Sequence, residues 1–189
     1  DALAIVDRDI RLTYRQWYTK ISALVAAFDA VGLRAGDHLA TVLQNRWEAA
    51  TLHWACQFAG IIITPINWRA KADEIDFYLE NSEARAVVYQ DISAAAVAQS
   101  KLAPDLHRIA LDEPAAGEIV FPEMIAATGR EAEPRVASDA WSVMLYTSGT
   151  TSRPKGVPCR LRAERHYAVA HVAQNMYGAG DCTPGGMPL

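Results

Sequence analysis

Residues 38–64 read HLATVLQNRWEAATLHWACQFAGIIIT, with an apolar run at each end of a longer mixed segment. The first run, His38–Leu43, is short and partly β-branched, which predicts a strand. The second, Ile61–Thr64, is a continuous β-branched run of the kind found in buried parallel strands. Asn45 is expected to cap the helix between them, and Gly60 to end it. A strand, a helix and a strand in this order predict a βαβ unit.

The same alternation extends outward from this unit in both directions. Toward the amino terminus, Ala4–Val6 and Arg11–Thr13 predict a short hairpin, and Thr13 is placed to cap a helix with an apolar stripe from Trp17 to Val31. Toward the carboxyl terminus the expected elements are helices at Lys71–Asn81, Ser93–Lys101 and Arg162–Tyr177 and strands at Ala86–Tyr89, Arg108–Leu111 and Trp141–Tyr146. The predicted fold class is therefore α/β, a mainly parallel sheet flanked by helices.

Composition excludes several classes of protein. The 189 residues carry 18 Lys and Arg against 22 Asp and Glu, a net charge of −4, which lacks the basic excess of proteins that coat nucleic acids. No apolar run approaches the roughly 20 residues that a membrane-spanning helix needs. We therefore expect no nucleic-acid partner, no membrane span and a cytoplasmic location.

Cysteine and histidine spacing argues against a disulfide framework or a structural metal site. Cys56, Cys159 and Cys182 are odd in number and far apart, and no C-x-x-C pair occurs. His166 and His171 are five residues apart, so on a helix they would lie on different faces. A reducing compartment is the expected environment.

Residues 146–157 read YTSGTTSRPKGV and follow a predicted strand. Successive hydroxyl and glycine residues allow backbone N–H groups to converge on an anion, and Lys155 adds a point charge suited to phosphate oxygens. The segment is not a Walker A loop, because Lys155 precedes a glycine and no Ser or Thr follows it. The carboxyl end of a parallel strand is also where open α/β sheets bind ligands. These features together predict a phosphate-binding loop.

This segment resembles the phosphate-loop signature of the adenylate-forming superfamily, which includes acyl-CoA synthetases, aryl-CoA ligases, luciferases and adenylation domains of peptide synthetases. The signature reads Y-T-S-G-T-T-G-x-P-K-G-V, and the chain departs from it at Ser152, where the family usually has Gly. Leu12–Arg15 ahead of a helix and Pro65–Arg69 resemble further family elements, the latter most like bacterial acyl- or aryl-CoA ligases. By this resemblance, residues 1–189 are a truncated N-terminal domain of an AMP-dependent synthetase or ligase, with the C-terminal domain absent.

The resemblance implies a reaction in two steps. A carboxylate attacks the α-phosphate of ATP to give an acyl-adenylate and pyrophosphate, and the thiol of CoA then displaces AMP. The implied nucleotide-binding residues are Thr147, Ser148, Gly149, Thr150, Thr151 and Lys155. Among them, Lys155 is implied as catalytic and Thr147 as a Mg²⁺ ligand. The family's adenine contacts and catalytic lysine would lie downstream, so we expect this chain alone to be inactive.

Two alternatives remain open on the sequence. An adenylating enzyme could transfer the acyl group to a carrier-protein thiol or another acceptor in place of CoA. The chain could also be a non-catalytic nucleotide-binding or scaffolding fragment. If position 152 needs a positive φ, Ser152 costs about 1 kcal/mol or more of backbone strain.

Several aromatic and basic residues have two interpretations each. Trp47 and Trp54 could line a substrate pocket, but helical spacing favours core packing. Trp68 lies in a predicted loop and fits either role. Arg69 could brace the phosphate loop or form a surface ion pair.

One basic cluster lies just after the phosphate loop. Arg160, Arg162 and Arg165 could steer a nucleotide, although a solvated helix face is the favoured interpretation. Cys159 lies beside them without a base to activate its thiol, so we expect it to take no part in chemistry.

Overall fold

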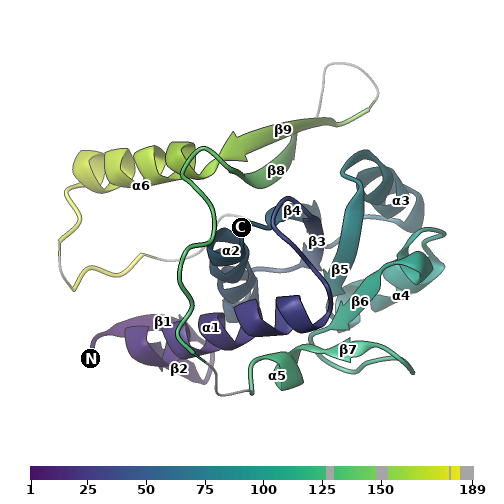
Figure 1. Cartoon of the computed structure of the whole chain (residues 1–189), viewed down its shortest axis with the longest axis horizontal. Coiled ribbons are helices and arrows are strands. Elements are labelled where there is room, and N and C mark those ends of the chain that lie inside the picture. The colour runs from purple at the N-terminus through teal and green to yellow at the C-terminus, as the bar shows by residue number, and fades with distance from the viewer. Residues whose placement is uncertain (127–129, 148–152, 179, 184–189) are drawn as a thin grey trace.

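The computed structural model describes residues 1–126, 130–147, 153–178 and 180–183. Its centre is a seven-stranded sheet in the order β7-β6-β5-β3-β4-β8-β9 (Figure 1). The strands are β3 (His38–Leu43), β4 (Ile62–Asn67), β5 (Ala84–Tyr89), β6 (His107–Ala110), β7 (Ile119–Val120), β8 (Trp141–Thr147) and β9 (Lys155–Arg160). Every neighbouring pair is parallel except β8 with β9, which confirms the predicted α/β class.

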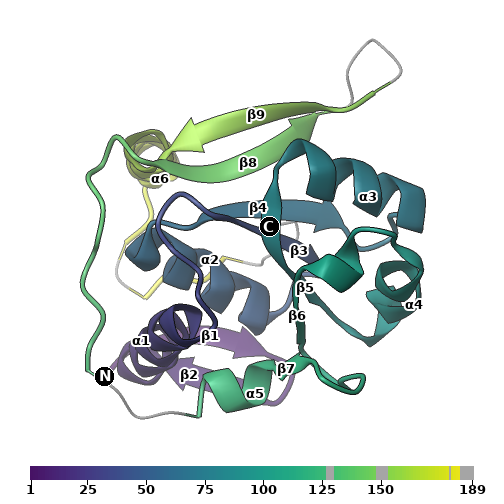
Figure 2. The same cartoon turned by 45° about the vertical axis from the view of Figure 1, so that its right-hand side comes forward.

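Helices cover both faces of this sheet (Figures 1 and 2). One face carries α1 (Tyr14–Ala30), α2 (Trp47–Ala59) and α5 (Phe121–Met124); the other carries α3 (Ala72–Asn81), α4 (Asp91–Gln99) and the short 3-10 helix η1 (Ala103–Asp105). The last helix, α6 (Leu161–Asn175), follows β9. The predicted amino-terminal hairpin is confirmed as β1 (Leu3–Asp7) and β2 (Ile10–Thr13), an antiparallel pair that contacts α1.

The central strands separate two apolar cores. Successive side chains of a strand point to opposite faces, so Leu39 packs with Leu24 of α1, whereas Val42 packs with Ile75 and Leu79 of α3. All five side chains are almost fully buried. Burial on both faces explains why these strands appear in the sequence as continuous apolar runs.

Two predicted helix boundaries are confirmed. Thr13 and Gln16 form a capping box at the start of α1: the Gln16 N–H donates to Thr13 Oγ1 at 3.3 Å, and the Thr13 N–H donates to Gln16 Oε1 at 2.9 Å. Gly60 ends α2 in the left-handed conformation, with φ of +76°. Local sequence determines both features.

The predicted cap of α2 is wrong. The capping position is Arg46, not Asn45. The side chain of Arg46 makes no capping hydrogen bond to the helix. The N–H of Trp47 instead donates to Asp7 Oδ2 at 3.0 Å. The partner comes from β1, forty positions away, where no local pattern points to it.

The predicted phosphate-binding loop, residues 146–157, ends inside a strand, because Lys155–Arg160 forms β9. The segment contains Gly156 and Pro158, both poor strand formers. The strand forms because β8 provides an antiparallel partner along its length, from Trp141 opposite Arg160 to Thr147 opposite Lys155. Pro is tolerated here because β9 is the outermost strand of the sheet.

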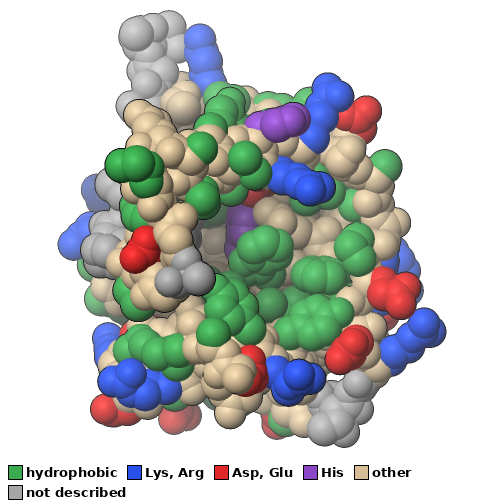
Figure 3. Space-filling view, turned by 90° about the vertical axis from the view of Figure 1, so that its left-hand side faces the viewer, with side chains coloured by type: hydrophobic (Ala, Val, Ile, Leu, Met, Phe, Trp, Pro, Cys, Tyr) green, Lys and Arg blue, Asp and Glu red, His purple; other side chains and the backbone are tan. Residues whose placement is uncertain are grey.

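Helix α6 differs from the other long helices because none of its residues is buried. Apolar side chains on and just after it are exposed, among them Tyr167 at 71% and Met176 at 87%. Figure 3 shows the face on which α6 and the amino-terminal hairpin lie, where hydrophobic side chains gather around a hollow. Within the described parts of the chain, no helix is both long and apolar enough to cross a bilayer.

Candidate active site

The predicted phosphate-binding segment connects the two strands of the β8–β9 hairpin. Thr147 is the last residue of β8, Lys155 is the first residue of β9, and the two are register partners. Both are exposed. The other predicted nucleotide-binding residues, Ser148, Gly149, Thr150 and Thr151, and also Ser152, lie outside the described residues. The structure therefore pairs Thr147 and Lys155, the two predicted nucleotide-binding residues that it describes, across the hairpin.

This pair lies at the carboxyl edge of the parallel sheet. Strand β8 runs parallel to β4 with Val143 opposite Ile63, so Thr147, the last residue of β8, lies toward the carboxyl end of the parallel strands. In open α/β sheets this edge is where ligands bind. The binding role of Thr147 and Lys155 stays a prediction.

Farther along the same edge, charged side chains are paired with one another. The Arg46 guanidinium donates to Glu48 at 2.8 Å and to both carboxylate oxygens of Asp112 at 3.0 Å. Glu48 is buried, so its charge requires this partner. These groups stabilise the loops after β3 and β6 rather than being available to a ligand.

Tyr146 connects the hairpin to α3 beneath the predicted loop. Its hydroxyl donates to Asn81 Oδ1 at 2.8 Å. Its ring makes edge contacts with Tyr78, at a centroid distance of 4.7 Å, and with Phe77, at 6.2 Å. The pKa of Tyr146 is raised, mainly because the residue is partly buried and to a smaller extent because Tyr78 is close by. No local pattern in the sequence predicts this contact, because 65 positions separate Tyr146 from Asn81.

The opposite end of the hairpin is fixed to α2 and α6. Arg160 stacks on the Trp141 ring at 4.0 Å. Glu164 of α6 accepts from Gln57 at 2.9 Å and lies 3.1 Å from His53 Nε2, both on α2. Burial alone would raise the pKa of Glu164, but hydrogen bonds from its neighbours, led by His53, lower it overall. This polar cluster holds α6 against α2.

The basic cluster after the loop has partners within the protein. Arg160 bonds to the Asp139 carbonyl as well as stacking on Trp141, and Arg162 forms an ion pair with Asp139 at 2.8 Å. Arg165 is exposed on α6. The favoured prediction of a solvated surface, rather than a nucleotide-steering patch, agrees with this arrangement.

Two of the tryptophan interpretations can be decided. Trp47 packs against the core as predicted, whereas Trp54 is 43% exposed and the core prediction for it is wrong. It lies on the outer side of α2, in edge contact with Trp17 at 6.4 Å. Trp68 stacks under the Arg69 guanidinium at 3.8 Å, an arrangement that neither interpretation of Arg69 included.

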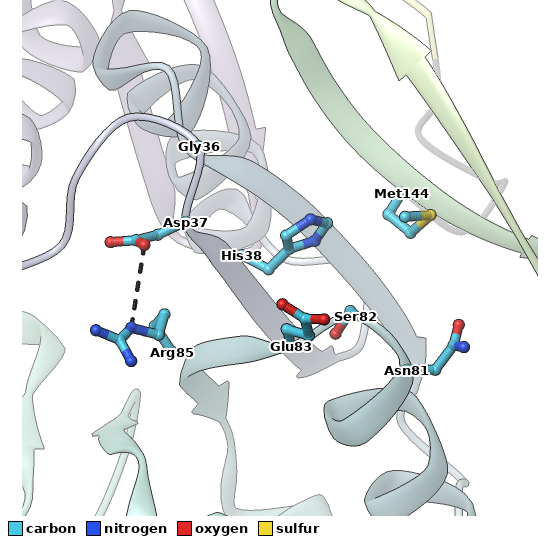
Figure 4. Close-up of a pocket in the computed structure, with 8 residues that line it drawn as sticks. All are labelled: Gly36, Asp37, His38, Asn81, Ser82, Glu83, Arg85 and Met144. Atoms are coloured by element: carbon cyan, nitrogen blue, oxygen red, sulfur yellow. Dashed lines mark ion pairs between the residues drawn. The ribbon is translucent and has the colours of Figure 1, made fainter.

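Figure 4 shows a polar hollow at the amino ends of β3 and β5, with a volume of about 540 Å³. Asp37 and Arg85 approach to 4.0 Å at one side of it, and Asn81 and Met144 lie at the other. Burial lowers the pKa of His38, partly offset by the charges of Glu83 and Asp37. The hollow opens at the amino ends of β3 and β5 and extends to Met144 of β8, three residues before Thr147.

Comparison with known proteins identifies the family. The model of the family described as AMP-binding enzyme matches residues 1–185. The chain belongs to this family. The resemblance found in residues 146–157 is thus confirmed over nearly the whole chain.

Two curated relatives show what this chain is similar to. The 4-hydroxybutyrate–CoA ligase 2 of Metallosphaera sedula is 28% identical over 187 residues, covering 93% of this chain and 34% of the relative. The fatty acid–[acyl-carrier-protein] ligase ScoC of Streptomyces coeruleorubidus is 30% identical over 149 residues, covering 77% of this chain and 27% of the relative. The chain spans about a third of the length of the curated relatives it matches.

Among solved structures, the anthranilate CoA ligase AuaEII in complex with anthranoyl-AMP has a TM-score of 0.82 against this chain at 23% identity. The alignment covers 89% of this chain and 33% of that one. This likeness shows that the two chains share a fold over the aligned part.

Proposed function

We propose that the chain is the phosphate-binding part of an AMP-forming acid–thiol ligase. The observation that carries the proposal is the pairing of Thr147 with Lys155 at the carboxyl edge of the sheet, in a chain of the AMP-binding enzyme family. The whole enzyme would join a carboxylic acid to ATP, release pyrophosphate, and transfer the acyl group to CoA.

Charge stabilisation is the task of this site in the first step. A carboxylate oxygen forms a bond to the α-phosphorus, and the bond from that phosphorus to the bridging oxygen breaks as pyrophosphate leaves. Negative charge grows on the departing oxygens, and the ammonium of Lys155 would stabilise it together with N–H and hydroxyl donors of Ser148, Gly149, Thr150 and Thr151. Losing one such donor costs about 3–4 kcal/mol in the transition state.

The role of Mg²⁺ is part of the same proposal. Thr147 offers an exposed hydroxyl oxygen, a ligand type that Mg²⁺ accepts. The described residues contain no group of three His, Cys, Asp or Glu side chains placed to hold a metal ion. Thr147 would be one ligand of the ion. Bound with ATP, the ion would neutralise phosphate charge.

A second candidate has the same first step and another acceptor. The similarity to a ligase whose name gives an acyl-carrier protein as the acceptor supports a carrier-protein thiol in place of CoA. A reducing, cytoplasmic setting would serve either acceptor, because both react through a free thiol.

The test is ATP–pyrophosphate exchange by the longer enzyme that contains this chain, with labelled pyrophosphate and a panel of aliphatic and aromatic carboxylates. Exchange that depends on one acid is the expected result. Absence of exchange with every acid in the panel would overturn the proposal. Adding CoA or a carrier protein with its phosphopantetheine arm then distinguishes the two acceptors, because only the correct thiol gives sustained AMP release.

On the same proposal we expect the chain to be inactive by itself, because it spans only about a third of the length of its relatives. Calorimetry of the 189-residue chain with Mg·ATP should give weak binding or none, and no exchange. Exchange at the rate of the longer enzyme would contradict this part.

A further inference from the structure

Tyr146 lies in β8, immediately before Thr147, and faces β9 across the hairpin. Its register partner on β9 is Gly156. A Cβ on Gly156 would lie 3.4 Å from Cε1 of the Tyr146 ring and 2.9 Å from Met144 Sδ. The tyrosine ring thus lies beside Gly156, an arrangement in which an aromatic ring covers a cross-strand glycine, and a side chain at position 156 would press on Met144 rather than on the ring.

The same ring is held from the other side by α3. Tyr78 and Phe77 surround it with edge contacts, and Asn81 accepts its hydroxyl hydrogen at 2.8 Å. Aromatic edge contacts and one neutral hydrogen bond each restrict the ring in a different direction. The residue next to Thr147 is therefore fixed to a helix that belongs to the rigid part of the sheet.

Two open hollows border this contact. One includes Asn81 and Met144, and the other lies between the acidic face of α3 and Arg153 with Pro154. These hollows leave the ring and hydroxyl of Tyr146 as a narrow contact between α3 and the end of the hairpin that carries the predicted phosphate loop. The polar cluster at Glu164 of α6 lies at the other end of the hairpin.

We propose that Tyr146 is a positioning residue for the phosphate loop, acting through Asn81 and the aromatic pair of α3. The inference rests on the proposed function, since it assumes that the loop binds the triphosphate of ATP. The anchored ring fixes Thr147 and Lys155 before the nucleotide arrives. Without the anchor, binding must also order the end of the hairpin, and the entropy of that ordering weakens nucleotide affinity.

The test uses the longer enzyme and two variants that each remove one partner of the hydrogen bond, Tyr146→Phe and Asn81→Ala, together with the double variant. Tyr146→Phe keeps the ring over Gly156, so the fold is preserved. Each single variant should raise KM for Mg·ATP about two- to tenfold in ATP–pyrophosphate exchange, the range for one neutral hydrogen bond. The double variant should raise it no further than one single variant, because the two groups act as one unit.

Tyr18→Phe is the matched control. It removes another half-buried tyrosine hydroxyl, bonded to the Ala132 carbonyl on the far side of the molecule. It should lower the midpoint of thermal unfolding as much as Tyr146→Phe does but leave KM for Mg·ATP unchanged. KM for the carboxylic acid should stay constant in all variants.

Three outcomes would overturn the inference: an unchanged KM for Mg·ATP in Tyr146→Phe, additive effects in the double variant, or an equal rise in Tyr18→Phe. Each requires that the unmodified enzyme exchange pyrophosphate. If the unmodified enzyme does not exchange, it is the proposed function that fails, so the two failures are distinguished.

Discussion

Gly60 and Val136 are in contact so close that no side chain fits between them. A Cβ built on Gly60 would lie 2.4 Å from Val136 Cγ1. The residue next to Val136 continues the contact, because the Arg135 N–H donates to the carbonyl of Phe58 at 3.0 Å. Gly60 thus has two functions: its positive φ ends α2, and its missing side chain leaves room for the segment that leads to β8.

Replacement of Gly60 by Ala should therefore cost more than the backbone strain alone. We expect a loss of about 2–4 kcal/mol in the free energy of unfolding, of which about 1 kcal/mol is left-handed strain and the rest is the clash. Gly117→Ala is the matched control, since Gly117 has φ of +83° and open space around it. Urea denaturation measures both. Equal losses at the two positions would contradict the clash, and Gly60→Ala with Val136→Ala should recover part of the difference.

Lys155→Ala should lower the rate of ATP–pyrophosphate exchange by about 10²–10³-fold in the longer enzyme, the expected effect of losing one charged donor to the leaving phosphates. The fold should be unaffected, because the Lys155 side chain is exposed. Lys101→Ala removes a surface lysine near η1 and should leave the exchange rate unchanged. Full exchange by Lys155→Ala would remove the assignment of this residue.

His38 should make the protein less stable below pH 6.5. Burial lowers its pKa from the ordinary 6.5, so the folded protein prefers the neutral ring. Above pH 6.5 the ring is neutral in both states; as the pH falls, the unfolded chain takes up the proton first, and the free energy of unfolding decreases. Titration of the ring by NMR should give a midpoint below 6.5.

A variant isolates this contribution. His38→Gln retains a polar partner for Thr64, which lies 3.1 Å from His38 Nδ1. It should flatten the dependence of unfolding free energy on pH between about pH 6.5 and pH 5. At pH 8 the ring is neutral in both states, so the difference in unfolding free energy between the variant and the unmodified chain measures the change in packing alone. An undiminished slope in His38→Gln would assign the pH dependence to other groups.

Glu164→Gln should loosen α6 at neutral pH. Its carboxylate accepts from Gln57 and lies beside His53, and we expect a loss of about 1–2 kcal/mol of local stability. Because the pKa of Glu164 is lowered in the folded protein, its contribution is present above the unfolded value of 4.5 and is lost as the pH falls below it. The variant and the unmodified chain should therefore converge in acid.

Amide hydrogen exchange along α6 measures this effect. Glu133→Gln is the control, because Glu133 is 79% exposed and its ion pair with Arg130 is long, at 3.7 Å. It should leave exchange in α6 unchanged. Equal exchange rates in Glu164→Gln and the unmodified chain at pH 7 would show that the cluster does not hold the helix.

Elements with a local signal were predicted well. His38–Leu43 has the predicted bounds, and Thr13 and Gly60 act as the predicted helix boundaries, since a cap or a stop depends on residues within one turn. Contacts between distant positions were not predictable in this way. The cap of α2 by Asp7 and the exposure of Trp54 depend on how whole elements pack.

The candidate site shows the same division. The motif in residues 146–157 pointed to Thr147 and Lys155, and the structure pairs them. Strand β9 was missed because Gly156 and Pro158 outweigh the alternation of Val157 and Cys159, although that alternation with period two was a usable signal. The contact of Tyr146 with Asn81 had no signal in the sequence, because only the folded sheet brings α3 beneath the hairpin.

Helix α6 buries none of its residues, so it depends on its polar clamp and on its link to β9 rather than on a core. A helix of 15 residues is marginal in water without tertiary support. Its first turns include Arg162 and Arg165, which trypsin recognises. Limited digestion should therefore cut the chain there well before it reaches α1 or α2, leaving the sheet with its helices as the resistant product.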